Sequence, residues 1–142
     1  MSAKFPLASN GRNRQHIEMT TSPEQMRART KQFAIRVVRL FRALPKTREA
    51  MVMGNQLLRS GTSVAANYRA ACRARSKAEF ISKVGTVVEE ADETVFWLEL
   101  LIETGTMKRD RMEVLLSEAN ELLAIFAASH RTARSEKSSI AR

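Results

Sequence analysis

No proline occurs between Pro45 and the C-terminus, and the chain of 142 residues contains five glycines and three prolines in all. Strands need a turn every few residues, and turns draw on glycine and proline. Long helices tolerate neither residue well in their interiors but need few breaks. The sequence therefore predicts long helices in preference to strands.

Apolar residues recur at helical spacing in four segments, and polar residues that favour helix starts precede them. Ser22 and Pro23 are typical of a helix start, Thr47 can cap the next helix, and Ser76 with Glu79 forms a capping box. Gly105 is a candidate C-cap. The four predicted helices cover Pro23–Ala43, Arg48–Arg73, Ser76–Thr104 and Lys108–His130.

Each predicted helix has one apolar face, and four such helices with short connections pack most simply as an antiparallel up-down bundle. The fold class is therefore all-α. Gly61 within the second helix predicts close approach of a neighbouring helix, since a helical glycine costs about 1 kcal/mol relative to alanine. We expect residues 1–21 to form a disordered tail, 22–130 the bundle, and 131–142 a flexible basic tail. The predicted core residues are Met26, Phe33, Val37, Leu40, Phe41, Leu44, Leu57, Gly61, Val64, Tyr68, Cys72, Phe80, Val84, Val87, Val88, Ala91, Val95, Leu98, Ile102, Met112, Leu115, Leu116, Ala119, Leu122, Leu123 and Phe126.

Charge is segregated along the chain, whose formal net charge is +9. Residues 23–44 carry six basic side chains against one acid, and residues 45–75 again carry six against one. Residues 76–105 carry two basic side chains against seven acids. A basic surplus on the first two helices favours anionic partners such as nucleic acid.

Three arginines of the second helix, Arg59, Arg69 and Arg73, lie within about 80° of one another on the side away from the core. We call them the arginine strip and predict that they bind nucleic acid together with Arg75 and Lys77. The alternative is a solvated face, or pairing with acids of the third helix. These acids are Glu89, Glu90, Asp92 and Glu93.

Phe96, Trp97 and Leu100 project to the side of the third helix opposite its core face. Large exposed apolar groups commonly mark protein interfaces, so we predict an oligomer interface here. The alternative is that the chain covers these groups itself. Asn67 lies in a line of small or polar residues on the second helix and is predicted to fix helix register. That line comprises Gln56, Ser63, Asn67, Ala70 and Ala74.

Chemistry for catalysis is missing from the sequence. The single cysteine, Cys72, excludes an internal disulfide and a cysteine-based zinc site. Neither His16 nor His130 has the glutamate three residues earlier that a di-iron bundle needs. We therefore predict no catalytic residue, no metal, no cofactor and no enzyme activity. No segment approaches a signal peptide or the roughly 20 apolar residues of a membrane span, so we expect a cytoplasmic protein without membrane partners.

From Leu44 to about Gly105, the chain resembles the four-helix-bundle family first noticed in intervening sequences of bacterial 23S ribosomal RNA genes. The resemblance implies a four-helix bundle and, for some members, a ring-shaped homopentamer. It also implies similarity to the accessory variability protein of diversity-generating retroelements, which binds nucleic acid. At positions that match the family, the resemblance implies that the residues important for function are Arg59, Asn67, Arg73, Ser76 and Lys77. The residues that carry it are Leu44-Pro45-Lys46, Gln56-Leu57-Leu58-Arg59-Ser60, Ser63-Val64-Ala65-Ala66-Asn67-Tyr68, Arg73-Ala74-Arg75-Ser76-Lys77-Ala78-Glu79-Phe80, Glu89-Glu90, Asp92-Glu93-Thr94 and Trp97-Leu98-Glu99-Leu100.

Two functions follow as hypotheses. The first is a non-enzymatic oligomeric accessory protein that binds RNA or DNA through the basic surface of its first two helices. The alternative is a structural or scaffolding homo-oligomer whose charged faces contact other subunits or a protein partner.

Overall fold

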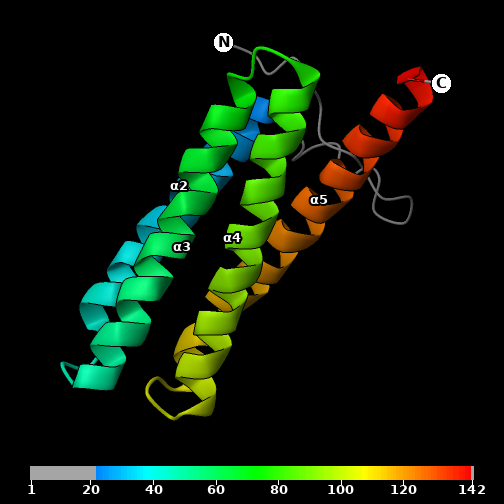
Figure 1. Cartoon of the computed structure of the whole chain (residues 1–142). Coiled ribbons are helices and arrows are strands. Elements are labelled where there is room, and N and C mark those ends of the chain that lie inside the picture. The colour runs from blue at the N-terminus through cyan, green and yellow to red at the C-terminus, as the bar shows by residue number, and fades with distance from the viewer. Residues whose placement is uncertain (1–21, 142) are drawn as a thin grey trace.

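The chain forms four helices in a computed structural model that describes residues 22–141 (Figure 1). Successive helices run in opposite directions, and each packs along its length against the next. Among the helices that pack side by side, the first and the last contact each other least. The predicted all-α, antiparallel up-down bundle is confirmed. The helices are α2 (Pro23–Ala43), α3 (Arg48–Cys72), α4 (Lys77–Glu103) and α5 (Arg109–Ala141).

The helix boundaries follow from local sequence. The Thr47 hydroxyl accepts a hydrogen bond from the Ala50 amide at 3.3 Å, and the Ser76 hydroxyl accepts one from the Glu79 amide at 3.1 Å. These bonds satisfy amides that lack a partner within the helix. The Ser22 side chain makes no such bond. At this end the first turn of α2 contains Pro23, which has no amide N–H that needs a partner. Gly105 has a φ of 71°, which ends α4 as predicted.

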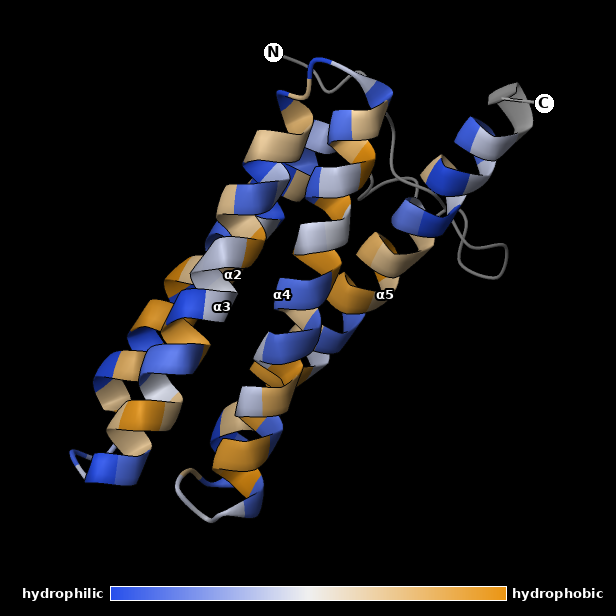
Figure 2. Cartoon of the chain, viewed as in Figure 1, coloured by the Kyte–Doolittle hydropathy of each residue, from blue (hydrophilic) through white to orange (hydrophobic). Residues whose placement is uncertain are grey.

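Most residues of the predicted apolar faces form one core that runs through the bundle, and Phe80 and Val84 belong to a second, smaller cluster. Apolar and hydrophilic residues alternate along every helix at the helical repeat, as expected for helices with one buried face (Figure 2). The rings of Tyr68 and Phe126 pack 5.1 Å apart within this core. Ile102 is only half-buried, whereas its neighbour Leu101, absent from the prediction, is fully buried. The other half-buried members of the predicted set are Leu40, Phe41, Val88, Leu116 and Leu123.

Two small residues allow α3 to approach its neighbours closely. A Cβ atom at Gly61 would lie 2.9 Å from both methyl carbons of Val37 on α2, so the predicted close approach is confirmed. On the other side of α3, the Thr94 hydroxyl from α4 donates to the Ser60 hydroxyl at 3.0 Å. Both of these side chains are fully buried.

The predicted end of the last helix at His130 is wrong, because α5 continues to Ala141. Ala133 is buried in a second, smaller apolar cluster that joins α5 to the end of α3 and the start of α4. Nearby, the Glu136 carboxylate lies 2.6 Å from the Lys77 ammonium. These contacts stabilise the helix beyond His130. The predicted N-terminal tail lies outside the described residues. The second cluster comprises Ala71, Ala74, Phe80, Val84 and Ala133.

None of the four helices is apolar over enough of its length to cross a lipid bilayer, as far as residues 22–141 are concerned.

Candidate functional site

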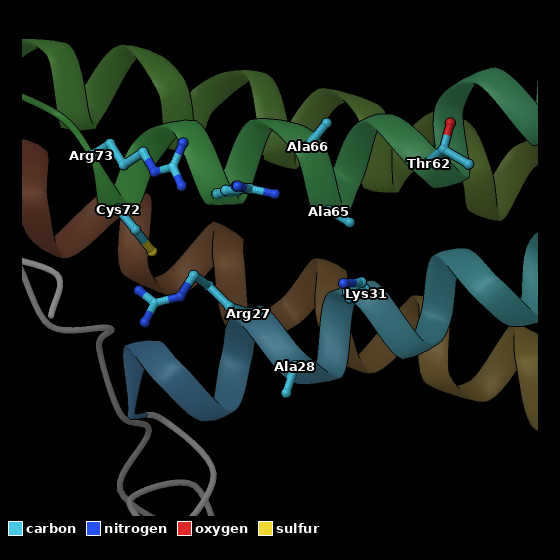
Figure 3. Close-up of a pocket in the computed structure, with 9 residues that line it drawn as sticks. Arg27, Ala28, Lys31, Thr62, Ala65, Ala66, Cys72 and Arg73 are labelled. Atoms are coloured by element: carbon cyan, nitrogen blue, oxygen red, sulfur yellow. The ribbon is translucent and has the colours of Figure 1, made fainter. Parts of the chain in front are cut away.

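A surface groove of about 520 Å³ lies between α2 and α3. Two basic residues of α2, Arg27 and Lys31, line it together with Arg69 and Arg73 of α3. In Figure 3 the side chains of Arg27 and Cys72 extend toward each other from the two helices. Among the described residues, none of those that line the groove is acidic. The remaining lining residues are small: Ala28, Thr62, Ala65, Ala66 and Cys72.

Helical spacing and helix direction together bring the four cations to one place. Arg27 and Lys31 are four residues apart, as are Arg69 and Arg73, so each pair occupies one face of its helix. Because α2 and α3 are antiparallel, the start of α2 lies beside the end of α3. The alanines between the cations leave the space that makes the surface concave.

The four cations of the groove carry charge that the described part of the chain does not neutralise. No carboxylate within residues 22–138 forms an ion pair with Arg27, Lys31, Arg69 or Arg73. Lys31, Arg69 and Arg73 are exposed, and Arg27 is half-buried. The groove is therefore a concentrated site of positive potential that is open to an anion.

The opposite edge of α2 is different, because one of its cations, Arg29, is paired with acids. The Arg29 guanidinium donates two hydrogen bonds to the Glu118 carboxylate of α5, at 2.6 and 2.9 Å. Glu121 lies 3.1 Å from the same group. The hydrogen bond to Glu118 raises the pKa of Arg29 above its ordinary value. Arg29 is thus neutralised by α5, whereas Arg27 and Lys31 on the side toward α3 have no such partner within residues 22–138.

The predicted nucleic-acid-binding residues do not share one environment. Arg59 is paired with two acids of α4, at 3.1 Å from Glu90 and also with Glu93. Its hydrogen bond to Glu93 lowers the pKa of that carboxyl. For Arg59, the structure therefore shows the alternative that the sequence left open, which is pairing with acids of α4. Arg69 and Arg73 instead lie in the groove.

The two remaining predicted residues lie near the connection between α3 and α4. Arg75 is exposed, with its Nε atom 3.7 Å from Glu79, and Lys77 is paired with Glu136. Sequence reasoning missed Arg27 and Lys31 as site residues. Their spacing on one helix face was visible in the sequence, but the position of that face against the end of α3 was not.

Cys72 closes the groove floor next to the core. Its side chain is 6% exposed, and its neighbour Tyr68 is buried beneath it. Burial, together with the Cys72 thiol, raises the pKa of Tyr68, so the phenol stays neutral. Within the described residues, no group of three histidine, cysteine or acidic side chains could hold a metal ion.

The predicted apolar interface is only partly exposed. Phe96 is 53% exposed, and its ring packs edge-to-face on Trp97 with centroids 4.9 Å apart. Trp97 and Leu100 are half-buried against the core of their own chain. The Trp97 indole N–H donates to Glu93 at 3.2 Å. Phe96 therefore projects alone among the three.

Asn67 makes its hydrogen bond within its own helix, donating to the Ser63 carbonyl at 3.0 Å. Within residues 22–138, Asn67 makes no hydrogen bond to another helix that would support its predicted role in fixing helix register. The buried hydroxyls of Ser60 and Thr94 make such a contact between α3 and α4.

The fold and the groove define a small helical-bundle protein with a basic surface site. The family described as 23S rRNA-intervening sequence protein matches residues 24–128. The chain belongs to this family, as the resemblance predicted. A crystal structure from Bacteroides thetaiotaomicron, described as a protein with unknown function from the S23 ribosomal protein family, is similar to this chain. The two share 36% sequence identity with a TM-score of 0.71, over 77% of this chain and 97% of that one. No protein with a curated description matches the sequence.

Proposed function

We propose that this protein is a non-enzymatic nucleic-acid-binding protein whose site is the groove between α2 and α3. The observation that carries the proposal is the set of four cations, unpaired within residues 22–138, around a concave surface without an acid. Arginine and lysine are the side chains that neutralise phosphates, and binding releases the counterions that surround a nucleic acid. We extend the proposal to a cytoplasmic location.

Two further points support a phosphate ligand over another anion. Three of the four cations are arginines, whose planar guanidinium groups can donate two hydrogen bonds to one phosphate. The description of the family refers to 23S rRNA, which makes fragments of that RNA suitable first probes.

The test is a pair of double variants with the same change in net charge. Arg69→Glu with Arg73→Glu reverses two cations of the groove. Arg39→Glu with Arg111→Glu reverses two exposed cations between α2 and α5, on the other edge of α2. Fluorescence anisotropy with labelled RNA and DNA would compare their affinities, and circular dichroism would check helix content.

We expect the groove variant to lose binding and the control variant to keep most of it. For the parent protein, four phosphate contacts predict that log K falls with log salt at a slope of about −3. If the groove variant binds like the parent while remaining helical, the groove is not the site. If both variants lose binding equally, net charge rather than the groove is responsible.

A structural homo-oligomer remains the second candidate function, and we propose the pentamer that the family resemblance implies as its form. The exposure of Phe96 and of Val52, 53% and 58%, favours an interface that the single chain leaves uncovered. Light scattering would give the particle mass across a salt series. A mass that stays that of one chain in the parent would exclude this candidate. Phe96→Asp should lower the mass if the interface includes α4.

A further inference from the structure

We infer that the groove binds the sugar-phosphate backbone of a single strand and leaves its bases in solvent. This inference rests on the function proposed above and names the part of the nucleic acid that is recognised. It follows from the spacing of the cations, the width of the groove and the chemistry of its floor.

The cations form two short rows that run along the groove. Residues four apart on a helix are separated by about 6 Å along its axis, so Arg27 and Lys31 form one row on α2. Arg69 and Arg73 form the second row on α3. An extended strand that follows the groove can present successive phosphates to such rows. Charge on both walls holds the backbone between the two helices.

The groove is too narrow for a duplex to enter. Axes of packed helices are separated by about 8–10 Å, whereas the major groove of B-DNA alone is about 12 Å wide. The phosphates of a duplex also lie on a convex surface, which could contact only the rim of a concave site. A single strand is flexible and can follow the space between α2 and α3.

The floor of the groove offers nothing that reads or stacks on a base. Ala28, Ala65 and Ala66 have no hydrogen-bonding side chain, and the Thr62 hydroxyl donates to the Leu58 carbonyl of its own helix at 2.7 Å. Among the described residues, no aromatic ring, side-chain amide or carboxylate belongs to the lining. Stacking on aromatic side chains contributes about 1–3 kcal/mol per base in proteins that hold single strands by their bases. Aromatic stacking is therefore missing from the described lining. The guanidinium planes of the groove arginines could also stack on a base, but in this proposal they bind phosphates, so the backbone carries the affinity.

The experiment uses three fluorescent probes of equal length with the full chain: a mixed-sequence single strand of DNA, an abasic deoxyribose-phosphate strand, and the duplex. We expect the abasic strand to bind within about threefold of the intact strand, because both present the same phosphates. We expect the duplex to bind at least about tenfold more weakly, since it cannot enter the groove and contacts the cations only from outside it.

A thiol placed at an exposed position of the groove provides an independent measure of where the probe lies. Ala66 is exposed and lines the groove, so Ala66→Cys combined with Cys72→Ser gives a single accessible thiol at this site. Its alkylation by a maleimide should slow when the intact or the abasic strand is bound. It should not slow when Arg69→Glu and Arg73→Glu are present and the same probe is added.

The outcomes separate this inference from the proposed function. If the intact strand binds through Arg69 and Arg73 but the abasic strand does not, the bases are recognised and the inference is wrong while the function stands. Equal binding of the duplex, with equal protection of the thiol introduced by Ala66→Cys, would overturn the preference for a single strand. Failure of all three DNA probes to bind would overturn the inference, and failure of the labelled RNA as well would remove the proposed function.

Discussion

The Thr94 hydroxyl of α4 donates to the Ser60 hydroxyl of α3 at 3.0 Å, and both side chains are fully buried. The same Thr94 oxygen lies 2.7 Å from the Glu90 carbonyl, and Ser60 Oγ lies 3.3 Å from the Leu57 carbonyl. The two hydroxyls therefore form a small polar network inside an apolar interface. Such a network favours one register of the two helices, because any shift would separate the hydroxyls.

Thr94→Val keeps the shape of the side chain and removes its hydroxyl. We expect a loss of about 1 kcal/mol in the free energy of unfolding, typical of one buried hydrogen bond. Ser60→Ala should cost a similar amount, and the double variant less than the sum of the two. Urea unfolding followed by circular dichroism measures all three. Strict additivity would mean that the two hydroxyls contribute independently.

Two glycines should respond in opposite ways to the same substitution. Gly61→Ala would place a Cβ atom 2.9 Å from the branched, stiff side chain of Val37, and we expect a net loss of about 1 kcal/mol or more. Gly85→Ala meets only the half-buried His130 ring, at 3.1 Å. There the better helix propensity of alanine should maintain or raise stability by up to about 1 kcal/mol. The midpoints of urea unfolding should therefore move in opposite directions.

The ion pair between Arg29 and Glu118 joins α2 and α5, the neighbouring helices with the smallest shared contact. Both side chains are 19% exposed, so each is partly shielded from water. Arg29→Met keeps the aliphatic stem but leaves the carboxylate without its partner, and we expect a loss of about 1–2 kcal/mol in unfolding free energy. Arg39→Met, at an exposed cation of the same helix, should change stability by less than about 0.5 kcal/mol. Equal effects would show that the pair contributes nothing.

The pairing of Arg59 with Glu93 makes stability depend on pH in the acidic range. The hydrogen bond from Arg59 lowers the pKa of Glu93 in the folded chain. Its contribution is therefore complete above the unfolded pKa of glutamate, about 4.3, and is lost as the pH falls through the lower folded value. Because both side chains are substantially exposed, we expect less than about 1 kcal/mol. By thermal unfolding, Arg59→Met should be less stable than the parent at neutral pH, and the difference should shrink as the pH falls below about 4.3.

The sequence predicted most of the bundle because helices, caps and apolar faces are encoded locally. Gly61 even indicated a close helix contact, which Val37 makes. The extension of α5 was missed because Ala133 is a weak apolar signal among serines and arginines, and its burial depends on distant residues. In α4, Leu101 is buried in place of the predicted Ile102. The two residues are adjacent on the helix, and which of them faces the core depends on how α4 is rotated against its neighbours.

The site was harder to predict than the fold. Arg59 and Arg69 were grouped because they lie within about 80° on one helix. That angle is nevertheless enough to place Arg59 against the acids of α4 and Arg69 in the groove beside α2. Which neighbour a helix face meets is a property of the whole bundle. The contribution of Arg27 and Lys31 became visible only once the direction and order of the helices were known.

The clustered cations of the groove also lower the stability of the ligand-free protein. Like charges four residues apart on a helix repel by about 0.2–0.5 kcal/mol, and the groove holds two such pairs facing each other. Arg69→Gln with Arg73→Gln should therefore melt at a higher temperature than the parent while binding anions more weakly. A polyanion that fills the groove should stabilise the parent more than this variant. Without a ligand, the like charges of the groove repel one another and lower the stability of the bundle. Binding of an anion at this one surface should therefore raise the melting temperature of the whole domain.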